Sequence, residues 1–311
     1  MPTTFTANVG YRGLVKLDNV VLMATDGSID LANNPIFSQG VIGLGYQNAA
    51  DQLMYANNYV QLSGSMGCQL TSGQPFNAVK AFAFTNRGST SGTNINIYPA
   101  GNKGFEGKGW CESLSFQCGQ DSVVQCSMNY KSYVDGQNNK IVTGNATNSE
   151  TGVSGDNVLS NLGGYNALFP YWGTTCSIDG TDIADVMDWS AQYSSSIEML
   201  KCCGTGGAYK DNEGAPLAPD YIAIGTMQGG GSLTIFSIVS DLAPINMHDQ
   251  RKNFVITITS PSQPGTSHRI TIPTMVLNSG GTSIQTGAGW ISAQLQFSAL
   301  GDGKKPPVSL D

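Results

Sequence analysis

Apolar and polar residues alternate along several stretches of this chain, and this alternation restricts the fold more than any other sequence feature. The apolar positions recur at every second residue from 60 to 70, and the same pattern returns from 187 to 199. A β-strand with one buried face has this repeat of two. The sequence therefore predicts two long strands, each with a polar face turned to water or to another subunit.

Three shorter stretches extend the β prediction in the second half. Residues 254–259, 269–272 and 290–297 are rich in β-branched and aromatic side chains, which favour strands. Turn-forming residues in 260–268 and 277–289 separate them, and the glycine-rich residues 229–232 predict a further turn. We expect a hairpin between Phe254 and Ile272.

Helical signals are few. The best candidate covers residues 72–82, where Ser72 or Gly73 could cap a helix and Pro75 could stand in its first turn. One short helix in each half of the chain fits this pattern. The predicted fold class is all-β with short flanking helices.

The composition favours an assembly protein over a DNA-binding one. Among 311 residues only 12% are charged and 39 are glycine, and 15 basic residues against 22 acidic ones give a net charge of −7. No broad cationic surface is available to hold a nucleic-acid backbone. An acidic channel would instead repel phosphates and let DNA pass without sticking. No apolar run approaches the roughly 20 residues that span a bilayer, and the first residues lack a secretory signal, so we expect no membrane anchor and synthesis in the cytoplasm.

An internal repeat is suggested by two similar segments. GWCESLSFQCG, residues 109–119, and GWISAQLQFSALG, residues 289–301, both open with Gly-Trp and place a phenylalanine near the end. The two spacings differ by one residue, which a β-bulge would explain. Residues 135–164 are rich in Asn, Gly, Ser and Thr and are typical of a long connection. We therefore expect one domain over residues 1–134, the connection over 135–164, and a second domain over 165–311.

Nothing in the sequence converges on chemistry, and we predict no catalytic, cofactor or metal site. The two histidines, His248 and His268, are assigned to loops or turns. The seven cysteines lack the spacing of a metal knuckle or a disulfide framework, so reduced and largely buried thiols are expected. The adjacent Cys202 and Cys203 leave an intersubunit disulfide as a minor hypothesis. The glycine pairs lack the context of a nucleotide-binding loop.

The strand pattern resembles the tail tube proteins of bacteriophages, in a duplicated form with two tandem domains. The resemblance is carried in the second half by NFVITITSPSQPGTSHRITIPTMVLN, residues 253–278, and by GWISAQLQFSALGD, residues 289–302. In the first half it is carried by YVQLSGSMGCQLTSG, residues 59–73, by NAVKAF and by residues 109–132. It implies two β-barrel or sandwich domains whose sheets join those of neighbouring copies into trimeric or hexameric rings. Such rings stack into the channel through which the genome leaves.

The resemblance also implies partners and a location. The partners would be other copies of the chain, tail sheath and baseplate proteins, and genomic DNA that passes without tight binding, all within the virion tail. The predicted lumen or ring-interface strands are residues 59–70 and 187–199. Their candidate polar positions are Gln61, Ser63, Ser65, Gln69, Asp188, Ser190, Gln192, Ser194 and Glu198.

Other functions remain open at this stage. A baseplate hub or tail-adaptor ring fits the same family, and a secretion-system tube protein has a related fold. A β-sandwich carbohydrate-binding module would use aromatic side chains for stacking; the candidates are Trp110, Trp172, Trp189, Tyr165 and Tyr171. An enzyme is the third class of function and has the least support.

Overall fold

A computed structural model describes most of the chain, and 71% of the described residues belong to β-strands. The described residues are 14–33, 36–37, 55–56, 60–86, 91–98, 104–135, 138–142, 167–200, 218–236, 250–261, 263–285, 290–301 and 306–311. Within them, 17 strands form one antiparallel sheet, and two further strands form a separate pair. The large sheet is not closed into a barrel. The prediction of a mostly β fold is confirmed, whereas the barrel alternative is not.

The first half supplies eleven strands and the only α-helix of the described residues. The strands are β1 (Leu14–Leu17), β2 (Val20–Val21), β3 (Met23–Gly27), β4 (Asp30–Asn33), β5 (Ile36–Phe37), β6 (Tyr55–Ala56), β7 (Val60–Gln69), β8 (Thr93–Tyr98), β9 (Gly104–Gly119), β10 (Gln125–Val134) and β11 (Lys140–Val142). The helix α1 (Gln74–Lys80) follows β7 and continues as a π-helical turn over Ala81–Thr85.

The second half begins with a single 3-10 turn and continues with eight strands. The turn is Tyr171–Gly173. The strands are β12 (Thr174–Ile178), β13 (Thr181–Ile183), β14 (Val186–Leu200), β15 (Tyr221–Ile235), β16 (Arg251–Thr259), β17 (Ser267–Gln285), β18 (Trp290–Leu300) and β19 (Ser309–Leu310).

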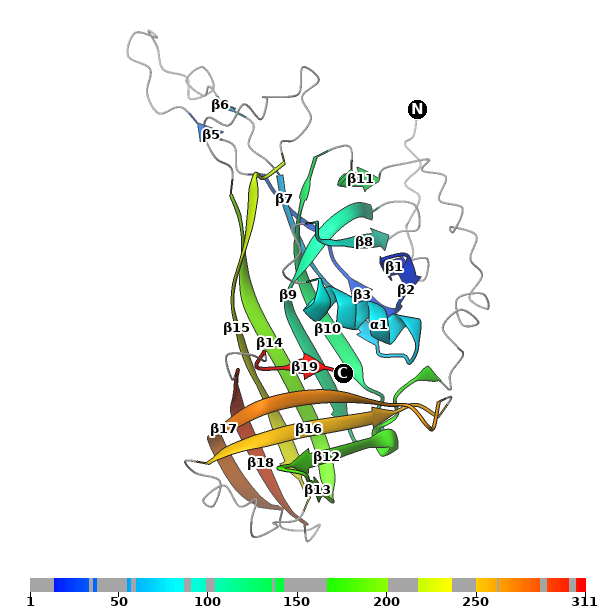
Figure 1. Cartoon of the computed structure of the whole chain (residues 1–311), viewed down its shortest axis with the longest axis vertical. Coiled ribbons are helices and arrows are strands. Elements are labelled where there is room, and N and C mark those ends of the chain that lie inside the picture. Colours follow the sequence, from blue (N-terminus) through cyan, green and yellow to red (C-terminus); the bar gives the residue numbers. More distant parts are fainter. Residues whose placement is uncertain are drawn as a thin grey trace.

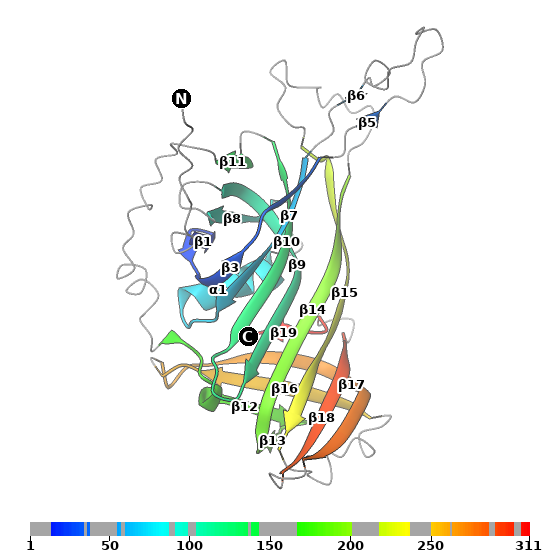
Figure 2. The same cartoon turned by 180° about the vertical axis from the view of Figure 1, so that it is seen from behind.

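The longest strands form one continuous run across both halves. Starting from β3 and β4, which both pair with β7, the order is β7, β10, β9, β14, β15, β18 and the last part of β17. The halves meet where β9 pairs with β14. Seen from behind in Figure 2, β7, β10, β9, β14 and β15 run side by side. In Figure 1, α1 lies over β9 and β10, while β16 crosses the long strands farther down.

The strands of the two halves pair in the same order. The first half pairs β1 with β2 and β8, β7 with β10, and β9 with β8, β10 and β11. The second half pairs β12 with β13 and β16, β15 with β18, and β17 with β16, β18 and β19. The strand β14 pairs with β15 as β3 and β4 pair with β7. The chain therefore contains a structural repeat.

Individual residues show that the register also repeats. The amide of Ser65 donates to Oγ of Ser28 at 2.9 Å, and that of Ser232 donates to Oγ of Ser190 at 3.0 Å. One residue bulges opposite β10 at Glu112 and opposite β18 at Asn278. Because a bulge shifts all later pairs by one residue, its presence at matching places keeps the two registers aligned.

The tight turns that open each half match as well. Asp18 and Asn19 connect β1 to β2 with positive φ angles of 45° and 68°, and Asp179 with Gly180 connects β12 to β13 with 49° and 80°. Positive φ at both central positions is the geometry of the two-residue hairpin turn that suits twisted strands. In each half the carboxylate of the turn aspartate accepts a hydrogen bond from the backbone N–H of an asparagine on the neighbouring strand. The distance is 3.0 Å from Asn94 to Asp18 and 2.8 Å from Asn253 to Asp179.

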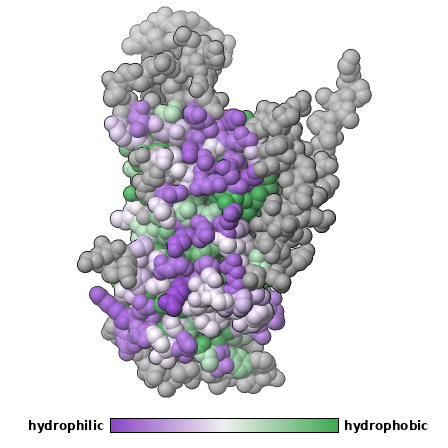
Figure 3. All heavy atoms as spheres, turned by 45° about the vertical axis from the view of Figure 1, so that its right-hand side comes forward, coloured by the Kyte–Doolittle hydropathy of each residue, from purple (hydrophilic) through white to green (hydrophobic). Residues whose placement is uncertain are grey.

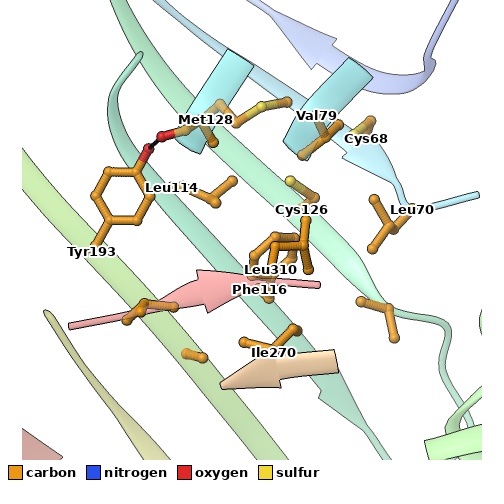
Figure 4. Packing of buried hydrophobic residues seen from close by; sticks show 14 of the residues in the cluster. Cys68, Leu70, Val79, Leu114, Phe116, Cys126, Met128, Tyr193, Ile270 and Leu310 are labelled. Atoms are coloured by element: carbon orange, nitrogen blue, oxygen red, sulfur yellow. Dashed lines mark hydrogen bonds between the residues drawn. The ribbon is translucent and has the colours of Figure 1, made fainter. Parts of the chain in front are cut away.

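One hydrophobic core underlies both halves. The side chains of β7, β10, β9 and β14 that point inward pack beneath α1, and strands β16, β17 and β19 complete the cover. Figure 4 shows Leu114 and Phe116 of β9 close to Met128 and Cys126 of β10, with Ile270 and Leu310 of the second half nearby. Tyr193 of β14 donates its hydroxyl hydrogen to the carbonyl of Ala83 at 2.6 Å. This bond connects the second half to the helical segment of the first.

Several elements occur where the sequence predicts them. The strands over residues 60–70 and 187–199, the hairpin from Phe254 to Ile272 and the helix near residues 72–82 are confirmed. No second α-helix occurs among the described residues of the second half. The connection over 135–164 lies mostly outside the described residues.

Three local predictions are wrong. The turns expected within residues 229–232 and 277–285 are strand, because β14 and β18 supply hydrogen-bonding partners for them. The expected match between residues 109–119 and 289–301 is also wrong, since it aligns β9 with β18. Strand pairing makes β17 the counterpart of β9 and β10 the counterpart of β18.

Gly231 should tolerate no side chain, whereas Gly281 should. A Cβ at Gly231 would lie 2.2 Å from the carbonyl oxygen of Ser190 and 2.8 Å from the ring of Phe297, while a Cβ at Gly281 meets nothing within 4 Å. Overpacking of this kind costs about 1–3 kcal/mol. We therefore expect Gly231→Ala to lower the free energy of unfolding by that amount in chemical denaturation. The matched control, Gly281→Ala, should change it by no more than about 0.5 kcal/mol. Equal effects would contradict this packing.

Candidate functional site

The strand run presents a polar face on the side opposite the core. On β7 this face carries Gln61, Ser63, Ser65 and Gln69, and on β14 it carries Asp188, Ser190, Gln192, Ser194 and Glu198. On β14 the intervening residues from Trp189 to Met199 are all buried. Since side chains alternate between the two sides of a strand, the nine predicted polar positions gather on one face.

Cross-strand pairing extends this polar face over seven strands. Residues directly opposite each other in an antiparallel sheet point to the same side. One such row runs from β7 to β17 without a charged or apolar side chain. Its members, in spatial order, are Gln69, Gln125, Gln117, Ser190, Ser232, Gln296 and Ser279.

Side chains along these rows bond to one another. The Gln117 amide donates to Oε1 of Gln125 at 3.1 Å. The hydroxyls of Ser190 and Ser232 lie 2.8 Å apart, and the hydroxyl of Ser279 donates to Oε1 of Gln296 at 3.3 Å. In the row that contains Asn129, its amide donates to the hydroxyl of Ser113 at 2.8 Å. These bonds hold the amides and hydroxyls in an ordered, uncharged layer.

The centre of the face is a shallow hollow of about 760 Å³. Hydroxyl, amide and glycine residues of β10, β9, β14, β15, β17 and β18 line it. Among the described residues of this face, the negative charges of Asp188 and Glu198 lie toward opposite ends of β14. The positive charge of Lys131 is paired with Glu112 at 2.7 Å. The lining contains no Asp, Glu, His, Cys, Lys or Arg, and the hydroxyl of its one tyrosine, Tyr193, donates to the buried carbonyl of Ala83.

Sequence reasoning found only part of this face. It singled out β7 and β14 and missed the contributions of β9, β10, β15 and β18. The residues missed on β9 and β10 are Ser113, Ser115, Gln117, Gln125, Ser127 and Asn129. Their signal was the same alternation, in the segments SLSFQ and QCSMN, which the search for a repeated Gly-Trp motif obscured.

His268 lies in strand β17 and not in a turn, so its predicted placement is wrong. Its ring stacks on Phe76 of α1 with centroids 3.8 Å apart, and Phe169 contacts it edge-on. Burial, with a smaller contribution from Lys80, lowers the pKa of His268 below its usual value. The imidazole is therefore a neutral packing element between the helix and the second half. His248 lies outside the described residues.

The described cysteines are buried and unpaired in disulfides, as expected. They are Cys68, Cys111, Cys118, Cys126 and Cys176. Burial raises the pKa of the Cys176 thiol to about 12 and also raises the pKa of Cys118 and Cys126. Because the thiolate is the reactive form, these residues are inert core side chains. Cys202 and Cys203 lie outside the described residues.

The four aromatic candidates for carbohydrate stacking that the structure describes do not form a platform. Trp110 and Trp189 are buried in the core, and Tyr171 is half-buried. Trp172 is 75% exposed. Tyr165 lies outside the described residues. The side of the molecule seen in Figure 3 is mostly hydrophilic, with hydrophobic residues in small patches.

The comparisons with known proteins leave the family open. No family model matches this sequence, and a search of curated proteins finds no match. In the described part of the chain, no three His, Cys, Asp or Glu side chains come together as metal ligands. No helix there has the length and apolar character needed to cross a bilayer.

Protonation of His268 at acid pH should destabilise the packing of α1 against the second half. Since its pKa is lowered in the folded state from an ordinary value of about 6.5, the unfolded chain takes up a proton first as the pH falls. The contribution of this residue to the stability of the folded state is therefore fully present above about pH 6.5. It is lost as the pH falls from there through the lower pKa of the folded state. We expect the melting temperature of the wild-type chain to fall more steeply between pH 7 and pH 5 than that of His268→Phe. Parallel pH profiles would show that the ring is not held neutral.

Proposed function

We propose that this chain is a structural tail tube subunit that assembles into stacked rings around a channel for genome passage. The observation that carries the proposal is the polar face with uncharged central rows, one of which continues over seven strands and across both halves. A face of this breadth, with no reactive group in its central hollow, suits a passive lining. The resemblance of residues 59–73, 109–132, 253–278 and 289–302 to phage tail tube proteins supports the same function.

The chemistry of the face suits a passing polyanion. Lys and Arg side chains would hold phosphates through released counterions, and the central rows contain neither. The sequence suggested an acidic lining that repels DNA, but the central rows are neutral. Hydroxyl and amide groups bonded to each other and to water give a passing phosphate no strong partner. In this proposal the channel is neutral, and this replaces the acidic lining.

The repeat supports the finer architecture within the same proposal. Two tandem tail-tube-like domains, over residues 1–134 and 165–311, would each contribute the same set of strands to a ring. Rings of three such chains would present six similar units, and rings of six chains are the alternative. The proposed partners are other copies of the chain, with sheath and baseplate proteins outside and genomic DNA inside, in the virion tail.

Negative-stain electron microscopy over a concentration series tests the proposal. We expect the purified chain to form stacked rings or tubes with an open bore as its concentration rises, because free strand edges pair between copies. Discrete single rings would instead support a hub or tail-adaptor protein. A compact monomer at every concentration would overturn the proposal.

Positive charge on the face should make the assembly retain DNA. Gln192 and Gln296 are exposed on the face, and Gln263 and Thr266 are exposed in the turn before β17. We expect assemblies of the Gln192→Arg/Gln296→Arg variant to bind a short duplex about tenfold more tightly than the wild type, with affinity that falls as salt is added. Filter binding measures this. The matched control, Gln263→Arg/Thr266→Arg, has the same net charge and should behave like the wild type. Equal retention by both variants would place the face away from the DNA path.

A further inference from the structure

Two strand edges have no second partner among the described strands, one at each end of the strand run. At one end, residues 26–32 of β3 and β4 pair only with β7 among the described strands. At the other end, residues 279–285 of β17 pair only with β18. Unpaired edges offer backbone donors and acceptors to another strand, and proteins commonly protect them with lysine, proline or bulges. Neither segment contains lysine, arginine or proline.

Within the chain, one strand pair already joins the counterparts of these two edges, and we call it the internal joint. In the middle of the sheet, β9 of the first half pairs with β14 of the second, with Ser113 opposite Ser194 and Gly119 opposite Asp188. By the repeat, β17 is the counterpart of β9, and β3 with β4 is the counterpart of β14. The chain therefore carries a second copy of each edge, and neither copy has a further partner in the described part of the chain.

The register of the internal joint can be transferred residue by residue. Ser113 and Ser279 occupy equivalent places, since they pair with Asn129 and Gln296 just after matching bulges. Ala32 and Ser194 are likewise equivalent, because they pair with Gln61 and Gln228. Ser28 and Ser190 make the same hydrogen bonds to their partner serines.

We propose that residues 279–285 of one copy pair antiparallel with residues 26–32 of a second copy of this chain, in the register of the internal joint. Ser279 then lies opposite Ala32, Gly281 opposite Asp30, and Gln285 opposite Asp26. The inference deepens the proposed function, because it rests on self-assembly into rings and names the residues of the contact. The contact is head-to-tail, and such contacts close into a ring when the rotation between copies divides a full circle.

Leu31 is an independent indication that this edge is covered. Its side chain is 55% exposed. Its counterpart at the internal joint, Tyr193, is 2% exposed and packs within the core. In the proposed pairing Leu31 lies opposite Gly280, which leaves space for the leucine side chain. A second copy therefore removes from water one of the few large apolar side chains exposed among the described residues.

The two edges are also electrostatically compatible. Asp26 and Asp30 supply negative charge on one edge, and the facing segment SGGTSIQ has no charged residue. No like charges are brought together across the joint, which would destabilise a strand pair. A Cβ at Gly281 meets no atom of its own chain within 4 Å. A cysteine can therefore replace this glycine without disturbing the isolated subunit.

Disulfide crosslinking tests the register. Directly opposed residues in an antiparallel pair lie within the Cα separation that a disulfide spans. Chains carrying Asp30→Cys are mixed with chains carrying Gly281→Cys, assembled, treated with a mild oxidant and run on a non-reducing gel. We expect up to about half of the mixed chains to shift from monomer to a dimer band, because random mixing places the matching cysteine opposite each cysteine-bearing edge half of the time. The double variant should give a ladder of higher multimers, and Ala32→Cys with Ser279→Cys should behave in the same way.

Controls separate the register from the assembly itself. Asp30→Cys mixed with Thr282→Cys shifts the pairing by one residue, which turns one side chain to the other face, and should crosslink no more than the wild-type chain. Hydrogen exchange on the unmodified protein should show residues 26–32 and 279–285 becoming protected on assembly. Rings that form without this protection, or that crosslink only through the mismatched pair, would overturn the inference and leave the proposed function standing. The absence of rings, crosslinks and protection at every concentration would overturn both.

Discussion

The antiparallel pairing of β9 with β14 is the contact on which the rest of this structure depends. It runs from Ser113 to Gly119 and joins two sets of strands that otherwise pair within their own halves. On the inner side it places Leu114 and Phe116 beside Ala191 and Tyr193, so that the main core extends through both halves. On the outer side it aligns serine and glutamine rows across the halves. Without this contact the core and the polar face would each be divided in two.

The bond from Tyr193 to the carbonyl of Ala83 strengthens this contact. Residues Ala81–Thr85 form a π-helical turn whose carbonyl groups follow an irregular pattern. A buried carbonyl without a partner costs free energy, and the tyrosine of the other half supplies a donor at 2.6 Å. The stacking of His268 on Phe76 makes a second contact between α1 and the other half. The helix therefore packs against strands of both halves.

The sequence predicted those strands whose side chains alternate on both faces. Strands β7 and β14 were found nearly to their ends for this reason, and the nine polar positions on them share one face. Residues 229–232 and 277–285 were missed because glycine has no side chain with which to show alternation. Gly231 is required there because the ring of Phe297 and the carbonyl of Ser190 fill the space above it. This reason depends on residues distant in sequence, so no local pattern could reveal it.

The repeat was predicted, but its alignment was not. Equivalent positions share backbone pairing and a few small residues, such as Gly64 opposite Tyr130 and Gly231 opposite Phe297. The bulges match in place but differ in chemistry: Glu112 pairs with the Lys131 ammonium, whereas Asn278 bonds to the Ser298 hydroxyl at 2.8 Å. The geometry of the strands therefore persists where the side chains differ. A motif search weights side chains, and so it selected a Gly-Trp match that the strand pairing does not support.

The differences between the two kinds of joint follow from covalent connection. The internal joint forms within one chain, so it can bury a tyrosine against a leucine without exposing either residue in a free subunit. The proposed joint between copies must remain open on each subunit until assembly. There the same positions hold Leu31 and Gly280, and the β17 edge is small and uncharged. Such an edge limits the apolar surface of the free subunit while its backbone groups retain the hydrogen bonds of a strand pair. A duplicated chain can in this way have one permanent joint and one that forms only on assembly.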